Sequence, residues 1–139
     1  MVIAIKIAGE FIETIIFSPP VKNALFSFEK VSKRTHLDIA SVNTACQMQL
    51  NDDSSINDIH LSAGGVAPYP KYLAETRSFL KGKKITAEVL KEAIAIINTE
   101  IAPISDVRGT AAYKQLLLRQ LFLAHFNNKE ELVNRVLAK

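Results

Sequence analysis

The stretch VNTACQMQL, Val42–Leu50, alternates with a period of two between side chains that suit a core and side chains that suit water. This pattern predicts a β-strand that is packed on one side and partly wet on the other. The predicted inward face consists of Val42, Thr44, Cys46, Met48 and Leu50, and the outward face of Asn43, Ala45, Gln47 and Gln49.

The residues after this strand predict its partner. The polar run NDDSS (residues 51–55) is typical of a turn, because Asn and Asp side chains bond their own backbone. Residues 56–65 then resume the alternation, with Ile59, Leu61 and Ala63 inward. Two such runs around a short polar loop predict a β-hairpin.

Two further apolar runs precede the hairpin. Residues 10–17 (EFIETIIF) predict a strand that ends before Pro19 and Pro20, which lack backbone donors. Residues 24–32 (ALFSFEKVS) predict a second strand. After residue 70 the apolar period becomes helical. We expect helices over residues 71–80, from an N-cap at Thr86, over residues 110–126 as the central buried helix, and over residues 129–139.

Strands followed by helices are typical of an α+β fold. We therefore expect one domain, residues 1–139, with an antiparallel sheet of three to four strands and about four helices packed on one face. The 48% hydrophobic and 22% charged residues agree with a folded soluble chain. No stretch approaches the ~20 consecutive apolar residues of a membrane span, so we expect a cytoplasmic protein without a membrane partner.

The composition offers little for catalysis or metal binding. Cys46 alone cannot form an internal disulfide, and on an inward face it behaves as a small hydrophobe. Asp52 and Asp53 fit a hairpin tip better than a catalytic pair. The glycines of AGG (residues 63–65) lack phosphate-loop spacing and predict a bend that needs positive φ or close backbone approach. We expect no catalytic residue and no metal site.

A basic cluster, Lys30, Lys33 and Arg34, lies between two predicted strands. It could bind an anion, or it could organise the loop through internal contacts. One form of the second alternative pairs Arg34 and Asp38 with Asp106 and Arg108. A third alternative, nucleic-acid binding, is disfavoured because the net charge is only +3 and the predicted strands lack interleaved surface aromatics.

Four stretches in this order resemble one known family: KVSKRTHLDIASV, HLSAGGVAPYP, FLKGKKIT and PISDVRGTAAYKQLLLRQL. The family is the C-terminal domain of the FAD-binding subunit of molybdenum hydroxylases, which include xanthine dehydrogenase and carbon monoxide dehydrogenase. The resemblance implies an oxidoreductase part that covers the isoalloxazine end of FAD. The FAD-cradling domain that precedes it in the family is expected to be absent here, so the chain should not turn over a substrate alone.

The resemblance also implies partners and site residues. Electrons would come from a molybdenum cofactor through [2Fe–2S] clusters, both held in partner subunits or domains, and would leave to NAD or another acceptor. Ile12 corresponds to an apolar residue near the flavin ring, and Lys30 to a lysine near its polar edge. The loop of residues 32–37 corresponds to one bordering the acceptor side, although the family often has acidic residues where this chain has His36 and Leu37. An alternative is a subunit-assembly domain that does not touch flavin.

Overall fold

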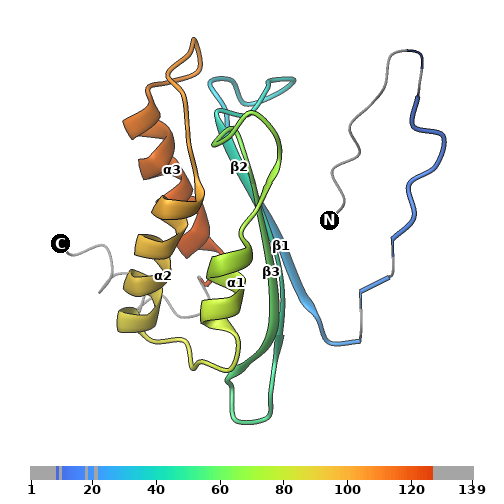
Figure 1. Cartoon of the computed structure of the whole chain (residues 1–139), viewed down its shortest axis with the longest axis vertical. Coiled ribbons are helices and arrows are strands. Elements are labelled where there is room, and N and C mark those ends of the chain that lie inside the picture. The colour runs from blue at the N-terminus through green and yellow to red at the C-terminus, as the bar shows by residue number, and fades with distance from the viewer. Residues whose placement is uncertain (1–8, 10, 18, 21, 127–139) are drawn as a thin grey trace.

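The computed structural model describes residues 9, 11–17, 19–20 and 22–126. Three helices in this part of the chain pack on one face of a four-stranded antiparallel sheet (Figure 1). The strands follow the order β1-β2-β3-β4. The bounds are β1 Leu25–Val31, β2 Val42–Leu50, β3 Ile56–Gly64, β4 Lys71–Tyr72, α1 Ala74–Leu80, α2 Ala87–Glu100 and α3 Ala111–Ala124. The predicted α+β class is confirmed, and the helix expected over residues 129–139 lies outside the described residues.

The predicted hairpin is β2 and β3. Cys46 pairs with Leu61 and Met48 with Ile59, so both inward faces meet the helices as one apolar layer. Asp53 accepts bonds from the backbone and the hydroxyl of Ser55, which fixes the turn. Leu50, predicted inward, is partly exposed because the register shifts between Gln49 and Leu50.

Two predictions for the chain on either side of the hairpin are wrong. Residues 11–17 form no strand, since no strand of the described chain pairs with them. The helix predicted from Lys71 begins at Ala74 instead. Lys71 and Tyr72 pair with β3 as β4, because the free edge of β3 offers their backbone hydrogen-bond partners.

The helix ends are satisfied by polar side chains. Thr86, the predicted N-cap of α2, accepts from the Val89 N–H at 3.2 Å. At the other end of α2, the Glu100 carboxylate accepts the N–H groups of Glu75 and Thr76 at 3.0 and 2.8 Å, and so caps α1. Helix α3 is present as predicted, but it is not buried all round: Tyr113 and Leu116 are exposed. None of the described helices has both the length and the apolar character needed to cross a membrane.

The bend after β3 depends on Gly65, as predicted. Gly65 has φ +81°, and a Cβ there would lie 2.3 Å from the Ser41 carbonyl oxygen. The loops that flank β2 and β3 therefore touch backbone to backbone, which only glycine permits.

Gly65→Ala should lower the free energy of unfolding by about 2–4 kcal/mol, from left-handed strain and from the clash with Ser41. Gly82→Ala is the matched control, because Gly82 has φ +79° but no atom within 4 Å of the added Cβ. Urea unfolding of both variants separates the two contributions. An equal loss in both would contradict the close approach.

A partly buried histidine joins α3 to the sheet. His125, just after α3, is hydrogen-bonded through Nδ1 to the Ser27 hydroxyl at 2.5 Å and through Nε2 to the Thr44 hydroxyl at 2.8 Å. A neutral imidazole suits this arrangement, because one nitrogen donates, the other accepts, and each hydroxyl can do either. Burial lowers the pKa of His125 from 6.5 to about 4.

This shift predicts acid sensitivity. The unfolded chain binds a proton at His125 near pH 6.5, whereas the folded chain does so only near pH 4, so stability falls as the pH drops between these values. His125→Gln should flatten the dependence of Tm on pH from 6.5 to 4.5, and His36→Gln controls for loss of a histidine in an exposed loop. The same slope in His125→Gln and the wild type would contradict the assignment.

Candidate functional site

Lys33 and Arg34 of the basic cluster lie in the loop that joins β1 to β2, Lys30 lies near the end of β1, and Asp38 contacts both parts. The Asp38 carboxylate accepts the N–H groups of Arg34 and Ile39 at 2.9 and 3.0 Å, and its Oδ1 lies 3.5 Å from Arg34 Nη2. The Arg34 backbone N–H, together with the Arg34 charge and the Ile39 N–H, outweighs burial and lowers the pKa of Asp38. The pairing of Arg34 is therefore within its own loop.

Lys30 lies near the end of β1, and its side chain is exposed. Its Nζ donates to the Asp38 carbonyl oxygen at 2.8 Å. An ammonium carries three donors, so two remain beyond this contact. Among the described residues no carboxylate forms a salt bridge with Lys30, so no such neighbour neutralises its charge.

A second loop, between α2 and α3, closes against the first. Lys33 Nζ donates to the Val107 carbonyl at 2.5 Å, and the Ser41 hydroxyl donates to the Arg108 carbonyl at 3.1 Å. The predicted exchange of partners between Arg34–Asp38 and Asp106–Arg108 is wrong. The two loops do meet, but the side chains of Lys33 and Ser41 bind backbone carbonyls of the second loop. Such contacts cannot be predicted from the charges of the residues.

Asp106 pairs with a residue that the sequence reading missed. Lys114, in the first turns of α3, is 2% exposed and donates to Asp106 Oδ2 at 2.8 Å and to the Ile104 carbonyl at 2.9 Å. The hydrogen bond from Lys114 is the main cause that lowers the pKa of Asp106. The sequence could have indicated this pair, because Lys114 stands in a largely apolar helix (AAYKQLLL) and a buried lysine needs a charged or polar partner.

The tip of the first loop carries an unusual backbone. Leu37 has φ +48°, a left-handed conformation that costs an L-residue roughly 1–2 kcal/mol, and its side chain is 97% exposed. An exposed leucine in this conformation gains nothing from packing within the described chain. Strained, exposed positions of this kind cluster at sites of contact with ligands or partners.

The structure does not bring Ile12 and Lys30 together. Ile12 lies in residues 11–17, which stand apart from the sheet (Figure 1), and its side chain is 76% exposed. Lys30 belongs to the β1 end of the sheet. A site that used both would have to be completed by other protein between them.

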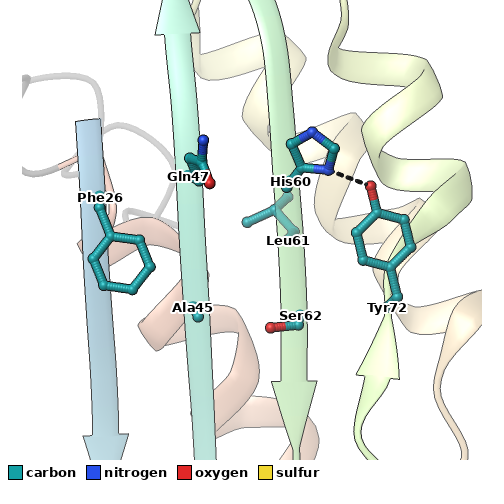
Figure 2. Close-up of a pocket in the computed structure, with 7 residues that line it drawn as sticks. All are labelled: Phe26, Ala45, Gln47, His60, Leu61, Ser62 and Tyr72. Atoms are coloured by element: carbon teal, nitrogen blue, oxygen red, sulfur yellow. Dashed lines mark hydrogen bonds between the residues drawn. The ribbon is translucent and has the colours of Figure 1, made fainter. Parts of the chain in front are cut away.

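The sheet face away from the helices is open and holds a shallow pocket of about 160 Å³ (Figure 2). The row Phe26, Gln47 and His60 crosses β1, β2 and β3 in register. Phe26 is 66% exposed and its neighbour Phe28 55%. The residues around the pocket are Phe26, Ala45, Gln47, His60, Leu61, Ser62 and Tyr72.

A chain of polar contacts borders this pocket. Figure 2 shows His60 Nδ1 bonded to the Tyr72 hydroxyl, at 2.7 Å. His60 Nε2 lies 3.3 Å from Asp58 Oδ2, and Arg77 Nη2 donates to both Asp58 oxygens at 2.9 and 3.1 Å. Burial tends to raise the pKa of Asp58, but the Arg77 hydrogen bonds and charge outweigh it and lower the pKa. The contacts tie β4 and α1 to β3.

The remaining candidates are structural. Cys46 is buried, and burial raises its pKa to about 12, so it is a poor nucleophile. No group of three or more His, Cys, Asp or Glu side chains suited to a metal occurs among the described residues. The arrangement offers cations and an open, partly aromatic face, and it is suited to binding.

Comparison with known proteins identifies the family of this chain. Residues 27–128 match the CO dehydrogenase flavoprotein C-terminal domain family. Xanthine dehydrogenase of Blastobotrys adeninivorans is 30% identical over 129 residues, which are 88% of this chain and 9% of that protein. The glyceraldehyde dehydrogenase medium chain of Sulfolobus acidocaldarius is 30% identical over 100 residues, 71% of this chain and 34% of that protein. The chain thus spans about a third or less of these relatives.

Solved structures share the fold. A Cu,Mo-CO dehydrogenase superposes with a TM-score of 0.70 at 22% identity, covering 84% of this chain and 39% of that chain. Quinoline 2-oxidoreductase from Pseudomonas putida 86 gives 0.68 at 17% identity, with the same coverage. Because the family match covers most of the chain, the protein belongs to the CO dehydrogenase flavoprotein C-terminal domain family.

Proposed function

We propose that this chain covers the isoalloxazine end of FAD in a xanthine dehydrogenase-like molybdenum hydroxylase. The observation that carries the proposal is Lys30, a cation at the end of β1 with two donors left beyond its bond to the Asp38 carbonyl. Such a group suits the polar edge of a flavin ring. The flavin would supply the two-electron chemistry, and a nearby cation would raise its reduction potential.

The bend at Gly65 supports the proposal that most of the FAD binds to another domain. Gly65 faces the Ser41 carbonyl oxygen, so its missing side chain makes room for backbone and not for a phosphate. The described residues contain no glycine-rich turn that opens a helix with phosphate-loop spacing. The pyrophosphate would therefore bind to the FAD-cradling domain that precedes this one in the family, and the two domains would share the flavin.

The proposed partners follow from the same arrangement. The upstream FAD-binding domain would complete the site, with Ile12 packed near the ring. Iron–sulfur and molybdenum subunits would deliver electrons, and NAD or another acceptor would remove them near the loop of Lys33, Arg34 and Leu37. In this arrangement the chain positions and covers the flavin, and it has no catalytic residue of its own.

A second candidate rests on the open face of the sheet. Phe26 and Phe28 are more than half exposed there, and aromatic side chains are enriched at protein interfaces. The domain could therefore dock subunits without touching flavin.

The charge at Lys30 separates the two candidates. In the chain reconstituted with its upstream domain, Lys30→Met should lower the flavin midpoint potential by about 30 mV, which is a tenfold change for a two-electron couple. Spectroelectrochemical titration measures it. Lys33→Met is the matched control, because it removes the same charge from a side chain held against the Val107 carbonyl.

Three outcomes decide between the candidates. A shift in Lys30→Met that clearly exceeds the shift in Lys33→Met supports contact with the ring. Equal shifts, or none, favour the assembly domain. A stable pair of domains without bound flavin would overturn the flavin role.

A further inference from the structure

Residues 11–17 expose a run of large apolar side chains. Five large side chains in this short segment are between 76% and 91% exposed, namely Phe11, Ile12, Ile15, Ile16 and Phe17. The segment stands apart from the sheet and helices (Figure 1). Contiguous apolar surface of this kind marks a site of interaction.

The sequence of the segment has the character of a buried strand. FIETIIF is dominated by β-branched and aromatic residues. In an extended backbone, Phe11, Ile15 and Phe17 would lie on one face, and Ile12 and Ile16 on the other. Apolar residues on both faces are typical of a strand covered from both sides.

The chain's own sheet cannot provide that cover. β1 is the edge strand nearest in sequence, and helices pack on only one face of its sheet. Phe26 and Phe28 of β1 are themselves largely exposed on the other face. A strand added beside β1 would therefore leave half of its apolar side chains in water.

We propose that residues 11–17 form a strand of the FAD-cradling domain's sheet, paired at a free edge and covered on both faces. The inference rests on the proposed function and goes further, because it names the segment that joins the two domains. The segment lies outside the family match, which begins at residue 27. This chain covers only 39% of the CO dehydrogenase chain and 34% of the glyceraldehyde dehydrogenase medium chain, so those relatives contain a large additional region.

Hydrogen exchange on the wild-type chain, alone and with the polypeptide encoded immediately upstream, tests the pairing. Backbone amides of residues 11–17 should exchange freely in the chain alone and at least about 100-fold more slowly in the pair. Thr14→Pro removes a ladder donor and should weaken the pair at least about tenfold. Thr14→Val, which keeps the N–H, is the matched control and should bind as the wild type does.

The outcomes separate this inference from the proposed function. Thr14→Pro should leave the Tm of the isolated chain unchanged, which shows that the body still folds. If the wild type forms no pair at all, the proposed function itself is overturned. If the pair forms with flavin but residues 11–17 stay unprotected and Thr14→Pro binds normally, only the strand is overturned. Protection that rises with concentration in the chain alone would assign the segment to a second copy instead, and would also overturn it.

Discussion

Burial of a single face of the β2–β3 hairpin is the constraint on which the rest of the structure depends. Ile59 and Leu61 on that face are buried in the core that the hairpin forms with the helices. Because the helices bury the apolar side chains of one face of the hairpin, the opposite face of the sheet needs no cover and stays open. The features that suit binding therefore lie on the open face or at the ends of the strands, outside the core.

The polar contacts divide into two groups with different tasks. At one end of the sheet, where Lys30 is presented, Asp38 and Lys114 each hold the shape of one loop, and Lys33 and Ser41 join the two loops. His60 and Asp58 instead link β3 to β4 and α1 along the open face. The first group shapes a cationic edge, and the second keeps a short edge strand in place beside a shallow pocket. A partner that binds across the open face would meet both.

The sequence predicted those elements whose period is set by burial within the chain, such as β2, β3 and α2. The strand predicted over residues 10–17 is wrong for the described chain, because none of its strands pairs with residues 11–17. The helix predicted from Lys71 was also wrong at its start, because Lys71 and Tyr72 pair with the free edge of β3 although their sequence has helical spacing. The loop contacts could not be read either, since Lys33 and Ser41 bind backbone carbonyls, which every residue carries. The placement of Lys30 beside flavin came from the family resemblance and stays a prediction.

The burial of Cys46 gives the molecule a built-in reporter. It is the single thiol of the chain, and it lies on β2 directly opposite Leu61, inside the layer between sheet and helices. A reagent that alkylates thiolates can reach it only when β2 separates from the helices. The rate of its modification therefore counts openings of the core, and it does so without a label, a substituted residue or a bound cofactor.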